Sequence, residues 1–407
     1  DPPSEQPYAF YRFTEEELDA RVGRTTLDRF NYAPGVFIQN TAPNQASPFI
    51  RGLTGEQSLL LLDGVRLSHA MMRPGPNQYA ALVPDVSIGA IDAILGSSSV
   101  VNGSDGLTGA LDFRLAPTGR GVSKGASPWF SSRVDTGNGG TLQGGVDGAS
   151  GNWLYSVELS ATQYHDRVGG KDFEERVFGP SVGAVEEIPN TAYDEYATGL
   201  RLAYLGLEDR VLEIKAGHNR QEDAPRPDGY FENTGNESRI SRYFDPMTFS
   251  YLHLRDTWEV NSDAVERLQT TLWWHQFGEE QFREDLRDGG TRYRRREVDD
   301  TLDAFGADVQ ATTLWGDSHE VTWGGTFLFE TTSNDYREFR SPAGSVNPAA
   351  AVAHNPEDWG NNTTVSDRSD YTTLGLFAQD DWQMTESFSL LTGLRYSRMD
   401  WSFGDVE

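Results

Sequence analysis

The stretch that decides the fold begins with Pro-Phe-Ile-Arg-Gly-Leu at residues 48–53. It continues through four leucines, Leu59–Leu62, which Asp-Gly-Val-Arg-Leu follows directly. A loop rich in proline and glycine spans residues 69–79, and Ile-Asp-Ala-Ile-Leu-Gly follows at residues 91–96. The stretch closes with a glycine-rich run at residues 102–113. Short apolar segments separated by Asp-Gly and Gly turns predict a small, compact sheet with little helix.

Four motifs in this stretch occur in an order and at intervals that resemble one protein family. They are "iRG" at residues 50–52, "LlDGvr" at 61–66, "IevlrG" at 91–96 and a "yGs.a..G.i.i" pattern at 102–113. An ordinary hairpin turn would explain any one motif alone. Together they are similar to the plug domain of TonB-dependent outer-membrane receptors, over roughly residues 10 to 120. The resemblance implies an α+β plug inside a transmembrane β-barrel.

Composition excludes several classes of protein. The 407 residues include 62 acidic and 34 basic side chains, no cysteine, and a net charge of −28. This charge argues against a nucleic-acid partner, because Lys and Arg clusters are needed to neutralise phosphates. Without cysteine there are neither disulfides nor thiolate metal sites. No apolar run approaches the roughly 18 residues of a membrane helix, whereas barrel strands alternate and keep the composition hydrophilic.

The N-terminal region carries helix signals. Thr14 and Glu17 fit a capping box, in which each side chain bonds the backbone N–H of the other residue. A second short helix is expected at about residues 26–32, before a proline that cannot continue it. Asp1 is not an initiator methionine, which favours a processed or truncated N-terminus. The family has a TonB box ahead of the plug, and residues 1–12 contain no convincing candidate for it.

Beyond about residue 121 the sequence alternates with a period of two. In Trp153, Tyr155, Val157, Leu159 and Ala161 the odd positions are apolar, and polar residues predominate between them, which predicts a strand with one apolar face. Most such segments exceed ten residues and suit tilted membrane strands. Eleven are expected, near residues 127–137, 140–149, 152–165, 193–206, 210–222, 247–260, 265–278, 301–315, 318–332, 370–384 and 386–400.

The connections between these segments favour a membrane barrel over a large soluble antiparallel sheet. Outer-membrane barrels have short periplasmic turns, long extracellular loops and aromatic girdles. Short turns are expected at 148–151, 206–210, 261–264, 316–318 and 385–386, and long loops at 166–192, 223–246, 279–300 and 333–370. The expected girdle residues are Trp129, Trp153, Tyr164, Tyr204, Trp258, Trp382 and Tyr396.

Eleven strands cannot close a barrel of this type, because plugged outer-membrane transporters have about 22 strands and an open edge cannot face lipid. The expected fold is therefore mainly β. Residues 1–120 form an α+β plug domain, and residues 121–407 form a partial antiparallel transmembrane barrel with about 11 of about 22 strands. The chain is expected to be a fragment of a longer protein.

Two groups of plug residues are candidates for functional contacts. Arginine is favoured for bidentate pairs, so plug arginines are expected to pair with inward carboxylates such as Glu158 or Glu330, or else merely to solubilise the sheet edge. These plug–barrel candidates are Arg51, Arg66 and Arg114. The resemblance implies that upper plug loops contact the ligand, and thioether and amide groups there suit a large amphipathic molecule. These ligand candidates are Asn44, Gln45, Met71, Met72, Arg73, Asn77, Gln78 and Tyr79.

A basic cluster at residues 292–296 has two interpretations. It could attract an anionic ligand, or surrounding Asp and Glu residues could neutralise it within a loop. Asp63, Asp92, Asp105 and Asp112 are expected to cap turns. No phosphate loop, metalloprotease motif or hydrolase motif is present in the sequence, and the seven histidines lack metal-ligand spacing. An enzyme is therefore not expected, nor is a bound metal or cofactor.

The resemblance implies active import of a scarce extracellular ligand across the outer membrane of a Gram-negative-type bacterium, driven by the energy transducer TonB. A ferric siderophore is the leading ligand class, with haem, a haemoprotein or cobalamin as alternatives. A surface protein that signals or adheres without transport is a further alternative on the same scaffold. The expected partners are TonB, outer-membrane lipid and an iron chelate or similar ligand, and the protein is expected to be a monomer.

Overall fold

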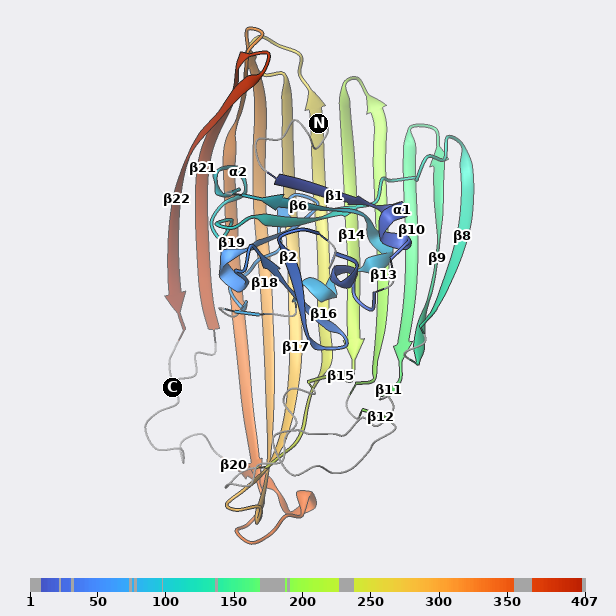
Figure 1. The fold of residues 1–407 in the computed structure, drawn as a ribbon, viewed down its shortest axis with the longest axis vertical. Helices are drawn as coiled ribbons and strands as arrows, with labels where there is room; N and C mark the ends of the chain where they lie inside the picture. Colours follow the sequence, from blue (N-terminus) through green and yellow to red (C-terminus); the bar gives the residue numbers. More distant parts are fainter. Residues whose placement is uncertain are drawn as a thin grey trace.

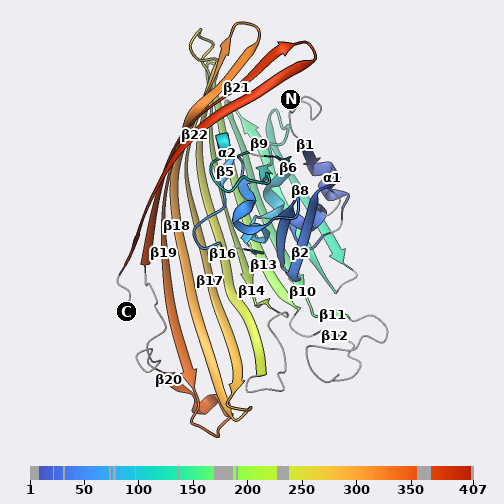
Figure 2. The same ribbon diagram turned by 60° about the vertical axis from the view of Figure 1, so that its left-hand side comes forward.

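The computed structural model describes residues 9–21, 23–30, 33–72, 75–76, 79–96, 98–135, 138–168, 187–188, 191–226, 238–354 and 368–404. A small N-terminal body lies against the concave side of one large curved sheet (Figures 1 and 2). The expected plug and partial antiparallel barrel are therefore confirmed. No helix in these ranges is long and apolar enough to cross a membrane.

The plug is built around a five-stranded mixed sheet with the order β1-β6-β7-β4-β5. Strands β4 and β7 pair in parallel, and the other neighbours pair antiparallel. A separate hairpin, β2–β3, extends toward the end of the barrel where β15 and β12 lie (Figure 1). The plug elements are β1 (Ala9–Thr14), α1 (Glu15–Asp19), η2 (Thr26–Phe30), β2 (Val36–Ala42), β3 (Gln45–Ile50), η3 (Gly55–Gln57), β4 (Leu59–Leu62), β5 (Val65–Arg66), η4 (Tyr79–Leu82), η5 (Asp85–Ser87), β6 (Ile88–Leu95), α2 (Ser99–Asn102) and β7 (Ala110–Leu115).

The four leucines of β4 form the centre of the plug. Each is at most 2% exposed. Leu60 and Leu62 belong to the main core, whereas Leu59 and Leu61 pack with Ala110 on the opposite face of the strand. The strand is thus covered on both faces, which is why its sequence is a continuous apolar run instead of an alternating one.

The local signals near the N-terminus agree with the structure. Thr14 accepts a hydrogen bond from the Glu17 backbone N–H, and the Glu17 side chain accepts one from the Thr14 N–H, so the capping box at α1 is confirmed. The second helix is a short 3₁₀ helix, η2. Asp92 lies buried within β6 and accepts from Arg12 and Arg114 instead of capping a turn. Asp112 lies buried within β7, and its Oδ1 accepts a hydrogen bond of 3.0 Å from the Gly64 N–H of the Asp63–Gly64 turn.

The barrel sheet contains eleven main strands in the order β22-β21-β19-β18-β17-β16-β14-β13-β10-β9-β8, so the expected number of strands is confirmed. Consecutive strands pair antiparallel as hairpins along this path. The main strands are β8 (Gly125–Asp135), β9 (Gly139–Ser150), β10 (Trp153–Tyr164), β13 (Tyr193–Leu207), β14 (Arg210–Glu222), β16 (Ser238–Glu259), β17 (Arg267–Arg287), β18 (Arg292–Trp315), β19 (His319–Arg340), β21 (Arg368–Thr385) and β22 (Phe388–Phe403).

Short accessory elements lie at the end of the barrel with the long connections (Figure 1). Strand β15 pairs with β16 and β20 pairs with β19, while β11 and β12 form a two-stranded sheet. These elements are β11 (Arg167–Val168), β12 (Glu187–Ile188), β15 (Ala224–Pro225), η7 (Pro348–Ala350) and β20 (Val352–His354). The division proposed at residues 120/121 falls between the last plug strand, β7, and the first barrel strand, β8.

Alternation along each strand separates an inner face from an outer face. In β10, Glu158 is fully buried beside the plug, whereas its neighbours Val157 and Leu159 are 45% and 60% exposed on the outside. Two aromatic residues expected in the outer girdles have the inward orientation instead. Trp129 lies under the guanidinium of Arg120, which follows the plug, and Tyr164 is 2% exposed.

The expected loop at residues 279–300 is wrong. Strand β17 continues to Arg287 and β18 begins at Arg292, so most of this segment forms an antiparallel ladder. Strands β16 to β19 have 21 to 24 residues each, well beyond the roughly 10 residues that cross a membrane. The parts of these strands that exceed a membrane span extend the barrel wall beyond the membrane, at the end with the long connections.

Candidate functional site

A buried carboxylate of the plug, Asp63, contacts two cations of the barrel wall. Its Oδ2 accepts hydrogen bonds from Lys215 Nζ and Arg255 Nη1, each at 2.8 Å. The side chains of Asp63, Lys215 and Arg255 are 7%, 8% and 10% exposed. Burial alone would raise the pKa of Asp63, but the two positive charges outweigh it and hold this pKa well below its usual range. The Asp-Gly turn is therefore fixed to β14 and β16 by charge.

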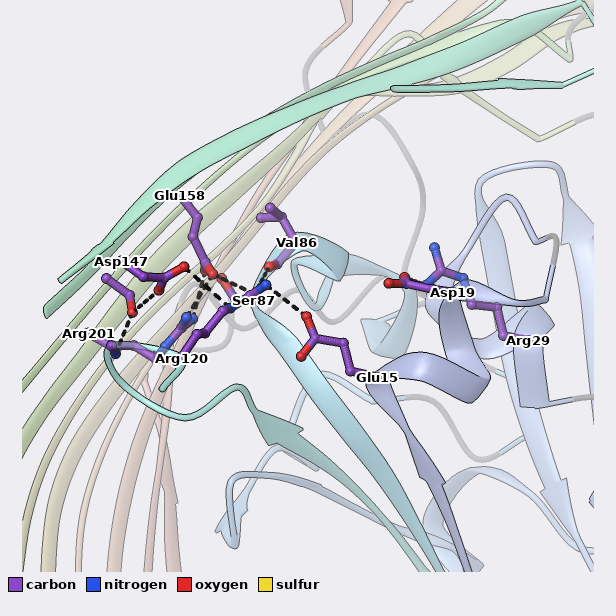
Figure 3. Close-up of polar contacts among 11 residues, drawn as sticks. Glu15, Asp19, Arg29, Val86, Ser87, Arg120, Asp147, Glu158 and Arg201 are labelled. Carbon is purple, nitrogen blue, oxygen red and sulfur yellow. Dashed lines mark hydrogen bonds and ion pairs between the residues drawn. The ribbon is translucent and has the colours of Figure 1, made fainter. Parts of the chain in front are cut away.

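A second ionic contact joins the other side of the plug to β10 (Figure 3). Glu158 accepts two hydrogen bonds of 2.7 Å from Arg201 of β13, and both side chains are fully buried. Arg120 donates to the same carboxylate at 2.7 Å, and Ser87 donates at 3.0 Å. Arg120 also bonds Glu15 of α1 at 2.7 Å. The network connects the barrel wall with the start of the plug's first helix.

Two of the three arginines expected to pair with the barrel wall form ion pairs inside the plug. Arg66 forms an ion pair with Asp105, and Arg114 forms one with Asp92 at 3.1 Å, so these partners belong to the plug. Arg51 is an exposed turn residue with a φ of 50°. Their role in plug–barrel contact stays a prediction.

Both carboxylates expected to face inward do contact the plug. Besides Glu158, the side chain of Glu330 accepts a hydrogen bond of 3.2 Å from the backbone N–H of Ala70. Lys215 and Arg255 were missed by the sequence analysis. Both lie on the polar face of a strand with alternating residues, which indicates that they face the inside of the barrel. Their partner could not be predicted, because Asp63 was expected only to cap a turn.

The ligand candidates on the β2–β3 hairpin are buried against the wall. Asn44 and Gln45 are at most 1% exposed, and Asn44 Nδ2 donates to Gln221 Oε1 of β14 at 3.0 Å. Nearby, Asn219 Nδ2 donates to the Leu82 carbonyl at 2.8 Å. In this structure Asn44 therefore seats the hairpin on the wall, whereas the Gln45 side chain accepts a hydrogen bond of 3.1 Å from Thr41 within the hairpin. The contact of both residues with a ligand stays a prediction.

The following plug loop borders a cavity. Met71 and Tyr79 lie on its plug side, and strands β16 to β19 supply the opposite wall. Met72 is instead buried in the plug core. Arg73, Asn77 and Gln78 lie outside the described residues. The cavity has a volume of about 380 Å³ and is lined by Ala70, Met71, Tyr79, Arg242, Phe244, Glu279, Gln281, Asp300, Thr332, Ser333 and Asn334.

The polar side of this cavity follows the strand register. Glu279 lies opposite Asp300, and Asp300 lies opposite Asn334, so three neighbouring strands contribute one row of polar side chains. Asn334 Nδ2 donates to Asp300 Oδ1. Carboxylate, amide and hydroxyl groups beside Met71 and Phe244 can bind an amphipathic molecule with both hydrogen-bond donors and acceptors.

Edge-on and tilted contacts between aromatic rings hold the base of the same plug loop. The His69 ring lies 4.1 Å from the Phe277 ring and 4.8 Å from the Tyr79 ring, measured between centroids. Burial, helped by the nearby His275 and Arg66, lowers the pKa of His69 to about 3. The imidazole is therefore neutral at physiological pH and packs as an aromatic ring.

The basic cluster at residues 292–296 is neutralised by its neighbours in the ladder. Arg294 and Arg296 each donate to Asp285 Oδ2 at 2.8 Å, and Arg295 pairs with Glu297 at 2.7 Å. These contacts favour the second interpretation of the cluster. Across the described ranges, no group of three or more His, Cys, Asp or Glu residues is arranged to hold a metal ion.

Comparison with known proteins agrees with this architecture. Residues 2–110 match the family "TonB-dependent Receptor Plug Domain", and residues 183–406 match "TonB dependent receptor-like, beta-barrel". The second match covers more than half of the chain, so the chain belongs to the TonB-dependent receptor family. Receptors of this family are transporters, not enzymes, and lie in the outer membrane of Gram-negative bacteria, so the expected localisation is confirmed.

Individual relatives are distant. The vitamin B12 transporter BtuB of Vibrio vulnificus is 28% identical over 109 residues, which are 26% of this chain and 17% of the relative. The FrpB iron transporter from Neisseria meningitidis has a TM-score of 0.72 at 14% identity, over 96% of this chain and 59% of that one. The ferric citrate transporter FecA has a TM-score of 0.67 at 17% identity, over 98% and 57%. The chain thus spans little more than half the length of these solved relatives.

Proposed function

We propose that this protein binds a scarce extracellular ligand and imports it across the outer membrane with energy delivered by TonB. The observation that carries the proposal is the seating of the plug. Buried ion pairs at Asp63 and Glu158 hold it against the inner wall, and ion pairs can separate and re-form without breaking covalent bonds. A plug held in this way closes a wide lumen at rest and can still be rearranged by a pulling partner.

The ligand is proposed to bind in the cavity between Met71, Tyr79 and the wall of strands β16 to β19. The barrel residues that line the cavity belong to the halves of β16 to β19 next to the long connections, which are extracellular in outer-membrane barrels. Its polar row and its apolar edge suit a large chelate with an apolar frame and many oxygen atoms. Asn44, Gln45, Met72, Arg73, Asn77 and Gln78 are kept as proposed ligand-binding residues, although Met72 is buried in the plug core.

A ferric siderophore is the proposed ligand class. FrpB and FecA, whose folds this chain shares, are iron and ferric citrate transporters. The sequence similarity to a vitamin B12 transporter over 109 residues supports cobalamin as the second candidate. Haem or a haemoprotein, and a surface protein without transport, remain the other candidates. The receptor is proposed to act as a monomer with TonB as its periplasmic partner.

Uptake assays test this proposal. Cells that express the receptor are given ferric citrate or ferric enterobactin labelled with iron-55, or labelled cyanocobalamin. The expected result is accumulation of an iron chelate that stops when TonB is absent or a protonophore is added. Accumulation of cyanocobalamin alone would replace the siderophore assignment by the second candidate. Accumulation that persists without TonB would contradict active import.

A further inference from the structure

An ion pair on the outer face of the barrel is the starting point. Arg210 at the start of β14 donates through Nε to Asp256 of β16 at 2.7 Å, and Nη2 donates to the same carboxylate. Lys215 and Arg255 reach the plug, so the residues at the alternate positions, Arg210 and Asp256 among them, point outward. The Arg210 and Asp256 side chains are 39% and 30% exposed. Two charges thus face the membrane.

The position of this pair corresponds to one membrane surface. A second outward pair on the same strand, Arg220–Glu222, lies ten residues further along. Ten residues span about 33 Å of strand, and a tilt of about 40° leaves roughly 25 Å along the membrane normal, which matches the apolar band of outer-membrane barrels. Arg210 follows the short turn at 208–209, so its pair lies at the periplasmic surface.

An apolar groove begins beside the Arg210–Asp256 pair. It has a volume of about 470 Å³, and its outward side chains come from five adjacent strands. The rings of Trp153 and Tyr204, with centroids 4.8 Å apart and planes inclined at 47°, form one wall. Apart from Asp256, the groove's outward side chains are Trp153, Leu202, Tyr204, Leu212, Ile214, Leu254, Thr270 and Leu272.

The chemistry of the groove and pair matches one kind of membrane lipid. Arg210 lies over the Trp258 ring at 5.6 Å, and its Nη1 donates to no residue that the structure describes, so it can donate to a phosphate oxygen. Asp256 presents a carboxylate to a headgroup ammonium. Neighbouring opposite charges of this kind complement a zwitterionic headgroup, and the groove accepts an acyl chain.

We propose that this surface is a binding site for a phospholipid of the periplasmic leaflet with an ethanolamine headgroup. The phosphate bonds Arg210, the ammonium group pairs with Asp256, and an acyl chain lies in the groove beside Trp153 and Leu254. The site is independent of the ligand cavity inside the barrel. It anchors the sheet at a fixed depth while the plug is pulled from the same side of the membrane.

Lipid titration tests the site. The receptor is purified from outer membranes, stripped of lipid with detergent, and titrated with phosphatidylethanolamine, phosphatidylglycerol or diacylglycerol carrying the same acyl chains. Native mass spectrometry counts the bound lipid. Phosphatidylethanolamine is expected to bind at the lowest concentration, and the double variant R210Q/D256N should weaken it about tenfold, the loss expected for a charge-assisted contact. The matched control R220Q/E222Q should bind as the parent does.

Two further variants keep the test decisive if R210Q/D256N folds poorly. T270W fills the groove while keeping the ion pair, and it should also reduce lipid binding. The swap R210D/D256R keeps both charges and should retain binding. Equal binding of diacylglycerol and phosphatidylethanolamine would overturn the headgroup assignment, and equal binding of phosphatidylglycerol would overturn the role of Asp256. Unchanged binding in R210Q/D256N, or equal loss in R220Q/E222Q, would overturn the site.

Discussion

Asp63 of the plug lies 2.8 Å from Lys215 of the barrel wall, measured between Oδ2 and Nζ, although 152 residues separate them in the sequence. Arg255 approaches the same oxygen at the same distance. One carboxylate thus pairs with two cations that are almost completely buried, and Glu213 lies 3.2 Å from Lys215 as a further acidic neighbour. Because its charge is the shared partner of both, Asp63 has more influence on the seating of the plug than either cation alone.

Replacing Asp63 with Ala should loosen the plug. The variant removes the carboxylate that Lys215 and Arg255 share and leaves Lys215 only Glu213, at 3.2 Å, and breaking a buried ion pair costs about 3–5 kcal/mol. We expect the plug to unfold at a lower urea concentration and the single-channel conductance in planar bilayers to rise. The matched control is Asp105→Ala, which breaks a pair with Arg66 inside the plug and should leave the conductance unchanged. Equal conductance of the Asp63 and Asp105 variants would contradict this account.

His69 should make the plug less stable in acid. Its pKa is about 3 in the folded plug, against about 6.5 in an unfolded chain, so between these pH values the unfolded state binds one more proton. The contribution of neutral His69 to the free energy of unfolding is therefore fully present above pH 6.5. It decreases by about 1.4 kcal/mol per pH unit as the pH falls from 6.5 toward 3.

The His69→Phe variant tests this pH dependence, because phenylalanine keeps the packing against Tyr79 and Phe277 but cannot be protonated. The urea midpoint of plug unfolding, measured between pH 7.5 and 5, should fall less steeply in the variant than in the parent. The exposed His165 provides the control, and His165→Phe should keep the parental slope. If His69→Phe and the parent have the same slope, His69 is not the group that titrates.

Two adjacent methionines should separate ligand binding from stability. Met71 lines the cavity, so Met71→Ala should weaken ligand binding several-fold, as expected for about 1 kcal/mol of thioether contact. Met72 is buried in the plug core, so Met72→Ala should destabilise the plug by about 2–5 kcal/mol. Affinity for labelled ferric citrate and urea unfolding are measured on both variants. Unchanged affinity in Met71→Ala would remove this loop from the proposed site.

Local sequence signals predicted the elements whose partners lie close in the chain. The capping box of Thr14 and Glu17 needs only a spacing of three residues, and the main barrel strands needed only alternation. The segment at 279–300 was assigned to a loop because it is polar and highly charged, and its charges were expected to neutralise one another within that loop. The strand register places them beside one another, and this pairing makes a highly charged ladder stable.

The contacts between plug and barrel could not be predicted in the same way. Arg66 and Arg114 are available to any carboxylate nearby, and in the structure they pair with Asp105 and Asp92 of the plug itself. Asp63 follows a leucine run in an Asp-Gly turn, which the sequence explains fully without a distant partner. Only the tertiary arrangement brings such residues to their partners across more than a hundred positions.

Asp285 occupies the same kind of central position in the extended β17–β18 hairpin. Its side chain is 1% exposed and accepts bonds from Arg283 at 3.0 Å and from Arg294 and Arg296 at 2.8 Å. Three cations therefore share one carboxylate. The electrostatic potential that these three arginines create at the ligand cavity depends on whether the Asp285 carboxylate remains charged.

Removing the charge of Asp285 should change how salt affects ligand capture. Asp285→Asn removes the one negative charge that the three arginines share. An anionic chelate such as ferric citrate should therefore bind more tightly at low salt, with an affinity that falls steeply as salt screens the charges. The double variant R294Q/R296Q should keep the shallow salt dependence of the parent, because both cations are already paired with Asp285. Asp288→Asn at the exposed turn is the control and should also resemble the parent. A flatter salt dependence in R294Q/R296Q would instead show that the arginines attract the ligand despite their pairing with Asp285.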